Sequence, residues 1–248
     1  MGYRKLPLTG LHNARELGGW PTPDGMTQYG VFIRTDLHEQ VTEEDLAYLR
    51  DYGVTMDVDL RNASELVRTP DPLKDEAWCE YVHLPTVEEK PDQEVDPSKF
   101  RPDPNFSMAK VYVRMADDRK DWVRKVFEAF GRCEGAAMYH CTLGKDRTGI
   151  ITALLLGNCG VSEQDIVADY TVTQVYLRRI IEIYQVKWAS EDRDKEKVKS
   201  MFGTPRTNME TLLKHLDDNY GGVPGYLRAC GVSDELAAKL KARLLGKA

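Results

Sequence analysis

Residues 136–158 join two apolar runs through a short polar segment, and this order strongly limits how the chain can fold. The run at 136–139 predicts a buried strand. Residues 148–158 are apolar on nearly every side, which predicts a buried helix that ends near Gly160. Strand, loop and helix in this order are typical of an α/β fold, whose active sites lie beyond the carboxyl ends of the strands.

The connecting segment reads H-C-T-L-G-K-D-R-T-G over residues 140–149, with five residues between Cys141 and Arg147. A loop of this length can curl so that its N–H groups converge on one anion, at the positive end of the following helix. Such a loop binds a phosphoryl group and lowers the pKa of its cysteine, so that a nucleophilic thiolate exists near neutral pH. A merely structural buried cysteine would leave Gly144, Arg147 and Thr148 unexplained.

Roles within this loop follow from the chemistry. We expect Cys141 to be the nucleophile and Arg147 to clamp two phosphoryl oxygens with its planar guanidinium group. Gly144 supplies a conformation that excludes a Cβ atom. Lys145 either adds a second positive charge at the mouth of the pocket or is a solvated surface lysine. The expected phosphate-binding residues are Thr142, Leu143, Gly144, Lys145, Asp146 and Arg147.

Two neighbours of the loop are predicted to support it. Thr148 is placed to donate its hydroxyl to the sulfur of Cys141, or it simply begins the helix. His140 directly precedes the nucleophile in a strand, so its side chain should point away from the phosphate. We therefore expect His140 to orient the loop through hydrogen bonds to the backbone, and we do not assign it as a general base.

The rest of the chain alternates strands and helices, which predicts one α/β domain over residues 1–248 with a central, mostly parallel sheet flanked by helices. Expected strands are 31–33, 54–60 and 80–84, and expected helices are 42–52, 121–130, 161–187, 206–219, 224–230 and 233–245. Residues 85–108 hold five prolines. This insertion either borders and covers the active site or is a disordered surface segment. The charged run 191–199 is expected to be a solvated helix face or loop.

Composition excludes several classes of protein. The net charge of −6 gives no support to nucleic-acid binding. No run of 18 apolar residues suggests membrane insertion, and residues 1–10 lack the apolar core of a secretory signal. Five cysteines stand far apart without C-x-x-C pairs, which favours a reducing compartment and a cytoplasmic protein, with secreted delivery as the alternative. No cluster has metal-ligand spacing, so no metal and no cofactor are expected.

Several motifs together resemble the bacterial atypical tyrosine phosphatases. The loop matches H-C-x-x-G-K-D-R-T-G, and three further segments agree: N-A-R-E-L-G-G at 13–19, D-L-R at 59–61 with Glu65, and Y-G-G at 220–222. Ala14 and Glu16 depart from the usual Phe and Asp of the first motif. The resemblance implies a cysteine-phosphatase-like fold with extra C-terminal helices near the site, and residues 161–205 would form a helical lid. It also implies action on phosphotyrosine and, in some members, on phosphoserine, phosphothreonine and phosphoinositides.

The general acid is the role with two candidates. The resemblance favours Asp146, inside the loop, as the group that protonates the leaving oxygen. Asp59, at the end of another expected strand, is the competitor, and Asp146 could instead hold the loop by an ion pair. Arg61 and Arg34 also lie near strand ends, where either could be buried in an ion pair with Glu65 or Asp36.

The leading hypothesis is a cysteine-dependent phosphatase that hydrolyses phosphotyrosine through a cysteinyl-phosphate intermediate. A phosphoinositide or inositol-polyphosphate phosphatase is the alternative, and Lys145 is the residue that bears on it. A non-catalytic phosphate-binding module would be expected to lack the Cys or the Arg of the loop. A sulfur-transfer or arsenate-reducing enzyme would need a second thiol, Cys133 or Cys159, near Cys141. The expected partner is a phosphorylated protein or a phosphoinositide as substrate; the oligomeric state is left open.

Overall fold

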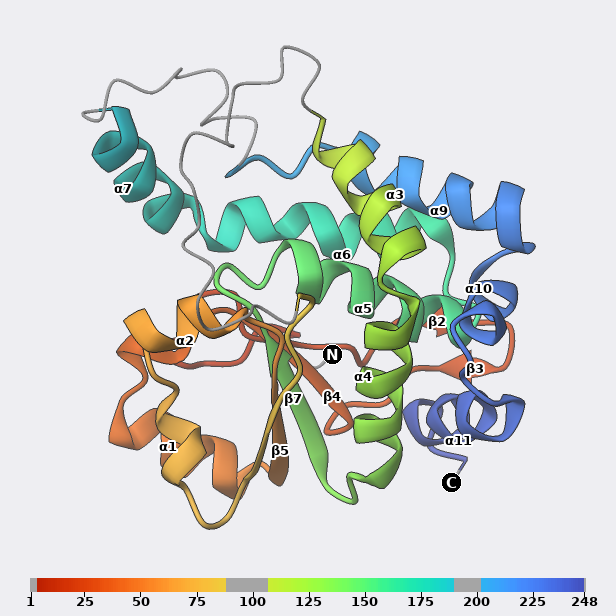
Figure 1. Ribbon diagram of the computed structural model, residues 1–248. Coiled ribbons are helices and arrows are strands. Elements are labelled where there is room, and N and C mark those ends of the chain that lie inside the picture. Colours follow the sequence, from red (N-terminus) through yellow and green to blue (C-terminus); the bar gives the residue numbers. More distant parts are fainter. Residues whose placement is uncertain (1–3, 88–106, 190–201, 248) are drawn as a thin grey trace.

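The computed structural model describes residues 4–87, 107–189 and 202–247 (Figure 1). Most of the proline-rich segment 85–108 and the whole charged run 191–199 lie outside the described residues, and so do the expectations made for them. None of the described helices combines the length and apolar character that a bilayer crossing needs.

A five-stranded sheet forms the centre of the molecule, with the strand order β1-β4-β7-β5-β6. Its strands are β1 (Arg15–Glu16), β4 (Phe32–Thr35), β5 (Val54–Asp59), β6 (Glu80–His83) and β7 (Ala136–His140). Neighbours from β4 to β6 pair in parallel, and only β1 is antiparallel. The predicted central, mostly parallel sheet is confirmed. A small hairpin of β2 (Pro21–Thr22) and β3 (Gly25–Met26) lies apart from it.

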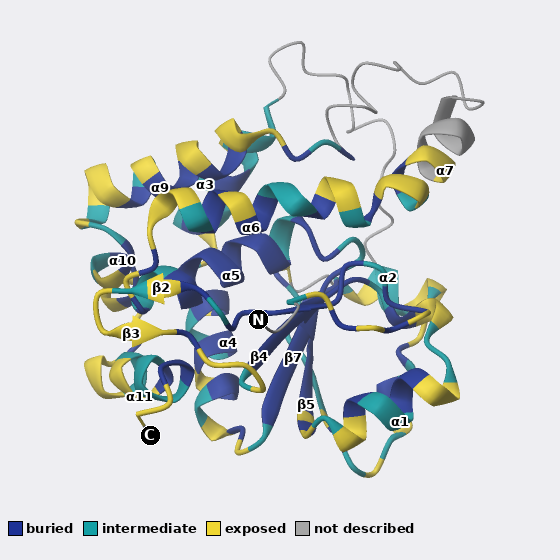
Figure 2. Ribbon diagram, turned by 180° about the vertical axis from the view of Figure 1, so that it is seen from behind, coloured by how far each residue is buried: buried dark blue, intermediate teal, exposed yellow. Residues whose placement is uncertain are grey.

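Helices cover both faces of this sheet, as Figures 1 and 2 show. The α-helices are α1 (Glu43–Asp51), α2 (Ala63–Arg68), α3 (Met108–Asp118), α4 (Lys120–Arg132), α5 (Asp146–Asn158), α6 (Glu163–Tyr176), α7 (Arg178–Ala189), α9 (Arg206–Tyr220), α10 (Val223–Ala229) and α11 (Asp234–Leu244). Two 3₁₀ turns, η1 (His38–Gln40) and η2 (Pro72–Asp75), complete the elements.

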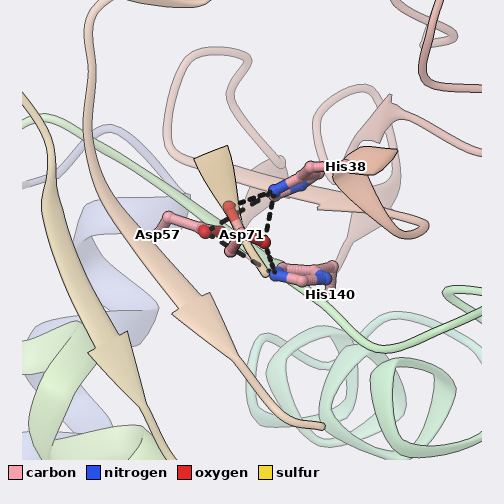
Figure 3. A group of neighbouring side chains, drawn as sticks. All are labelled: His38, Asp57, Asp71 and His140. Carbon is pink, nitrogen blue, oxygen red and sulfur yellow. Dashed lines mark hydrogen bonds and ion pairs between the residues drawn. The ribbon is translucent and has the colours of Figure 1, made fainter. Parts of the chain in front are cut away.

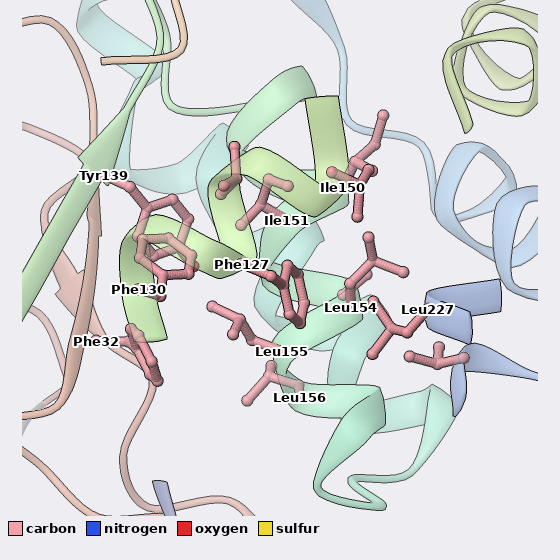
Figure 4. Packing of buried hydrophobic residues seen from close by; sticks show 14 of the residues in the cluster. Phe32, Phe127, Phe130, Tyr139, Ile150, Ile151, Leu154, Leu155, Leu156 and Leu227 are labelled. Carbon is pink, nitrogen blue, oxygen red and sulfur yellow. The ribbon is translucent and has the colours of Figure 1, made fainter. Parts of the chain in front are cut away.

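Alternation along β7 separates two hydrophobic cores. Ala137 and Tyr139 face the larger core, which α4, α5 and the C-terminal helices build (Figure 4). Ala136 and Met138 face the smaller core, which α1 and the N-terminal segment cover. Residues 136–139 of β7 are buried and apolar on both faces of the sheet. This explains why its sequence is an unbroken apolar run.

The helices differ from the expectation in three places. The predicted helix 161–187 is two helices, α6 and α7, with Leu177 between them. Helices α2 and α3 were not predicted: α2 has only six residues and none of them is buried, and α3 directly follows the proline-rich segment. The segments predicted at 206–219, 224–230 and 233–245 are confirmed as α9, α10 and α11, which are part of the larger core.

Candidate active site

The predicted strand–loop–helix unit is present. Residues 141–145 connect β7 to α5 at the carboxyl edge of the sheet, where β4 and β5 flank β7. Cys141 begins the loop and is 2% exposed. The loop thus lies at the N-terminal end of a buried helix, where the main-chain dipoles favour an anion.

Three residues outside the loop, Asn13, Arg34 and Leu37, donate hydrogen bonds to its carbonyl groups. Leu37 N–H donates to the carbonyl of Thr142 at 3.1 Å. The Asn13 amide donates to the carbonyls of Leu143 (2.9 Å) and Gly144 (3.0 Å), and Arg34 donates to the Gly144 carbonyl at 2.6 Å.

Hydrogen bonds to the carbonyl groups of residues 142–144 also fix the direction of the N–H groups in the same peptides. In a planar trans peptide the N–H points away from the C=O, so these contacts turn the following N–H groups toward the other side of the loop. Within the described chain, the N–H groups of Leu143 and Gly144 have no acceptor. They are therefore available to an anion at the loop's centre.

Gly144 confirms the expected exclusion of a side chain. Its φ is +59°, and a Cβ atom built there would lie 2.1 Å from the carbonyl oxygen of Thr35. Both facts come from the close approach of the loop to the end of β4. Any other residue would push the loop away from that strand.

Glu65 holds the guanidinium group of Arg147 in place. Arg147 Nη1 lies 2.6 Å and Nη2 2.9 Å from the two carboxylate oxygens, and Nη1 also donates to the carbonyl of Leu60. The Thr142 hydroxyl donates to the same carboxylate. Burial opposes ionisation of Glu65, but the hydrogen bonds and charge of Arg147 outweigh it and lower its pKa to about 2. A charged carboxylate thus orients the arginine without using all of its N–H groups.

The thiol of Cys141 differs from the other buried thiols. Burial would raise its pKa, yet the charge of Arg147 and the contact with Thr148 outweigh burial, and its pKa is lowered. Burial raises the pKa of Cys159 to about 12 and that of Cys230 to about 11. The Thr148 hydroxyl is fully buried and has no nitrogen or oxygen partner in the described residues, so it is free to donate to sulfur.

The two candidate acids lie in opposite environments. The side chain of Asp146 is 28% exposed, and its Oδ1 receives a hydrogen bond from Tyr112 at 2.6 Å. Asp59 is fully buried, and Arg61 and Tyr81 both donate to its oxygens. A buried carboxylate bound on both oxygens has no path to a substrate, whereas the carboxylate of Asp146 is partly exposed.

Lys145 is not a solvated surface residue, and that alternative is wrong. Its side chain is fully buried, with Nζ 3.4 Å from Asp146 Oδ1 and 3.3 Å from the carbonyl of Gly203. The lysine therefore contributes its charge from inside, next to the candidate acid.

The buried arginines pair differently from the expectation. Arg34 binds Asp169, with Nη1 2.5 Å from Oδ2, and neither Asp36 nor Glu65. Arg61 pairs with Asp59 and Asp71. Asp36 instead accepts main-chain N–H groups from residues 12 and 13. These pairings depend on how distant segments meet, which spacing along the chain does not reveal.

Asp169 was missed by sequence reasoning, although it organises the back of the loop. It accepts hydrogen bonds from Arg15 and Arg34, and Arg15 in turn donates to Asn13 at 2.6 Å. The pair Asn13 and Arg15 within the N-A-R-E-L-G-G segment was the available signal. For Asp169, a lone carboxylate beside the apolar face of a predicted helix was the only signal.

His140 contacts the loop backbone as expected, and its other ring nitrogen lies in a buried cluster of carboxylates that was not expected. Its Nδ1 lies 3.3 Å from the carbonyl oxygen of Cys141, as expected of a residue that orients the loop. Its Nε2 lies among buried carboxylates, 3.2 Å from Asp71 Oδ2.

Comparison with known proteins places this geometry in a family. The model of a family described as "Tyrosine phosphatase family" matches residues 6–246. The chain belongs to the tyrosine phosphatase family. The match covers the loop, its supporting residues and the C-terminal helices, so it concerns the whole of the described fold.

Curated relatives agree with this assignment. A tyrosine-protein phosphatase of Nostoc commune is 32% identical over 226 residues, which cover 86% of this chain and 74% of the relative. A putative tyrosine-protein phosphatase of Cupriavidus necator is 25% identical, and the match covers 92% of this chain and 84% of the relative. A triple specificity protein phosphatase of Mycobacterium tuberculosis is 25% identical, and the match covers 99% of this chain and 100% of the relative. The chain is accordingly a protein-tyrosine phosphatase, a hydrolase of phosphotyrosine.

Proposed function

We propose that Cys141 attacks the phosphorus of phosphotyrosine in line, so that an S–P bond forms as the bond to the tyrosyl oxygen breaks. The N–H groups of residues 142–147 and the guanidinium group of Arg147 hold the phosphoryl oxygens through the transition state. The observation that carries this proposal is the geometry of the loop. Its carbonyl groups accept hydrogen bonds from residues outside the loop, and Cys141 at its start has a thiol of lowered pKa.

Asp146 is proposed as the proton donor to the leaving phenolate. Its partial exposure and its position in the first turn of α5, directly before Arg147, support this role. Once cysteinyl-phosphate has formed, the same carboxylate takes a proton from the attacking water, and the S–P bond breaks. The buried hydroxyl of Thr148 then stabilises the departing thiolate.

The role of Asp146 is tested with aryl phosphates whose phenols differ in pKa. Asp146→Asn should lower kcat about 100-fold for poor leaving groups and much less for good ones, since only poor ones need protonation. An equal loss across the series would assign Asp146 to loop geometry.

Substrate breadth is a further part of the proposal. The Mycobacterium tuberculosis relative is named a triple specificity phosphatase, and this supports activity on phosphoserine and phosphothreonine beside phosphotyrosine. A cleft of about 150 Å³ adjoins the loop, lined by Leu37, Thr142, Leu143 and the α7 residues Ile180 and Ile183. Its lining, which also includes Asp36, Glu39 and Gln40, offers both apolar and polar contacts to residues next to the phosphorylated side chain.

The deciding experiment is steady-state hydrolysis of phosphotyrosyl, phosphoseryl and phosphothreonyl peptides beside a phosphoinositide panel, without added metal. Cys141→Ser should abolish turnover of every substrate of the loop, whereas Cys159→Ser, the same change at a buried thiol of raised pKa, should retain it. Preference for lipids would move the substrate class to phosphoinositides. Turnover that survives in Cys141→Ser would refute the mechanism.

Three broader proposals accompany this function. We propose that residues 1–248 form one phosphatase domain and that the described parts of segment 161–205, residues 161–189 and 202–205, cover the site; residues 190–201 lie outside the described residues. Support for the second point comes from Leu143 of the loop, which packs against Leu177, Ile181 and Phe202. A cytoplasmic location is proposed because all five cysteines are free thiols. Cell fractionation with an antibody to the chain tests the location.

A further inference from the structure

Four fully buried side chains converge directly behind the catalytic loop: His38, Asp57, Asp71 and His140 (Figure 3). They come from four separate segments: the η1 turn, strand β5, the stretch before η2 and the end of β7. Apart from His140 Nδ1, which lies against the carbonyl of Cys141, the proposed phosphatase chemistry uses none of their polar atoms.

One ligand atom from each residue lies within 4.8 Å of the other three, and four histidine–carboxylate distances are those of ligands around a common ion. His38 Nδ1 lies 3.0 Å from Asp71 Oδ2 and 3.7 Å from Asp57 Oδ2. His140 Nε2 lies 3.2 Å from Asp71 Oδ2 and 3.6 Å from Asp57 Oδ2. Ligands about 2.0 Å from a tetrahedral zinc ion are about 3.3 Å apart, which is the centre of this range.

Hydrogen bonding within the described chain does not account for this convergence. Neither carboxylate oxygen of Asp57 forms a hydrogen bond there, nor does Nε2 of His140, although these atoms lie at ion-pair distances. Between an imidazole and a carboxylate of the group, one contact has hydrogen-bond geometry, His38 Nδ1 to Asp71 Oδ1 at 3.1 Å, and a bound ion would take the place of the proton on that nitrogen. Buried polar atoms that approach without aligning suit ligands aimed at a common ion better than donor–acceptor pairs.

Charge points the same way. Arg61 is paired with Asp59 and also contacts Asp71 Oδ2 at 3.3 Å, so its single positive charge leaves two of the three carboxylate charges of Asp57, Asp59 and Asp71 unbalanced. Protonating both histidines would balance them. The rings of His38 and His140, however, are 4.0 Å apart between centroids, so two imidazolium charges would repel each other at close range. One divalent cation with neutral imidazoles balances the charge without that repulsion.

We propose that His38, Asp57, Asp71 and His140 bind a divalent transition-metal ion, with Zn²⁺ as the best fit to two imidazoles and two carboxylates in a compact, four-coordinate site. The other ring nitrogen of His140 lies 3.3 Å from the carbonyl of Cys141, which is the kind of contact that orients a metal-bound histidine. The ion is structural, since all four positions are filled by protein. It ties β5 and β7 to the η1 and η2 segments behind Cys141.

The first test measures the metal itself. Elemental analysis of the purified chain should find about one equivalent of zinc or a similar transition metal. Because the site is fully buried, exchange is done by unfolding with chelator and refolding with Zn²⁺, Co²⁺, Mg²⁺ or no metal. Zn²⁺ should raise the Tm of the refolded chain and Mg²⁺ should not. Bound Co²⁺ should show tetrahedral d–d absorption without the thiolate charge-transfer band that the cysteines would cause.

Variants locate the ion. His38→Gln should lose the metal and the Co²⁺ spectrum, whereas the matched control His215→Gln, at a histidine that pairs with Asp117 on the surface, should retain both. If His38→Gln does not fold, the Co²⁺ spectrum of the wild type still decides. Purified protein without metal, and a Tm that Zn²⁺ and Co²⁺ leave unchanged on refolding, would overturn the proposal. Neither result depends on phosphatase activity, so the proposed function stands or falls separately.

Discussion

Gly144 and Gly53 have positive φ angles for different reasons, and the contrast tests the loop at the scale of one residue. A Cβ atom at Gly144 would collide with the end of β4, whereas one at Gly53 would meet nothing within 4 Å. Gly144→Ala must therefore move the loop, and Gly53→Ala adds only backbone strain.

We expect Gly144→Ala to lower kcat/KM about 100-fold or more, the order of loss that a misplacement of 1 Å causes. Gly53→Ala should cost about 1 kcal/mol of stability and leave kcat/KM unchanged. Steady-state kinetics and urea unfolding of both variants measure these effects. Equal kinetics in the two variants would show that the approach to β4 is unimportant for catalysis.

Glu65 links the geometry of the arginine to pH. Its pKa is about 2 in the folded chain against an ordinary value of 4.5, so its ionised form stabilises the fold. This contribution is fully present above about pH 4.5 and is lost as the pH falls toward 2.

The difference in free energy of unfolding between wild type and Glu65→Gln should therefore be about 1–2 kcal/mol at pH 7 and should approach zero near pH 2. The partial exposure of the Glu65 side chain limits the size of this free-energy difference. Urea unfolding at several pH values measures it. Glu210→Gln, which removes an exposed pair with Arg206, should show almost no such trend, and a trend of the same size there would contradict this origin.

Helix α6 is connected to the catalytic loop by one carboxylate, and this coupling belongs to the scale of elements. Asp169 stands between Arg15 and Arg34, and both arginines also bind Asn13 or the loop itself. A change on α6 is thus transmitted to the carbonyls of the loop through two buried guanidinium groups.

Asp169→Asn leaves those two arginines without a counter-charge and should destabilise the fold by about 3–5 kcal/mol. It should also lower kcat/KM, because the loop carbonyls lose their fixed donors. Asp165→Asn on the same helix removes only the exposed cap contact with Ser162 and should cost about 1 kcal/mol or less. Comparable losses in both variants would argue against the coupling.

A single large core joins the sheet to helices from both halves of the chain, and this concerns the whole molecule. Phe32 and Tyr139 of the sheet, Phe130 of α4 and Leu227 of α10 belong to one continuous cluster (Figure 4). The C-terminal helices therefore cannot unfold without exposing the larger core.

We expect one cooperative unfolding transition. Leu227→Ala should lower the free energy of unfolding by about 2–4 kcal/mol, the usual cost of truncating a buried leucine. Far-UV circular dichroism, tryptophan fluorescence and phosphatase activity should follow the same curve. A separate early transition in the variant would show that α10 and α11 form an independent unit.

The sequence determined the elements that are local in the chain. The apolar run 136–139, the helix after it and the loop between them were predicted correctly, and so was the helix expected at 42–52, which is α1. Periods of two and 3.6 residues report which side chains face a core, and glycine and capping residues report where elements end. The family resemblance rested on the same local motifs.

Only the tertiary structure decided which polar groups meet. Arg147 and Glu65 are 82 positions apart, Arg15 and Asp169 are 154 apart, and the cluster around His140 draws on four segments. Periodicity says that a residue is buried and nothing about its partner across the core. The sequence could favour Asp146 over Asp59 only through the family resemblance, whereas their different burial and hydrogen bonds appear only in the folded chain, because the strength of a charge depends on the neighbours that folding supplies.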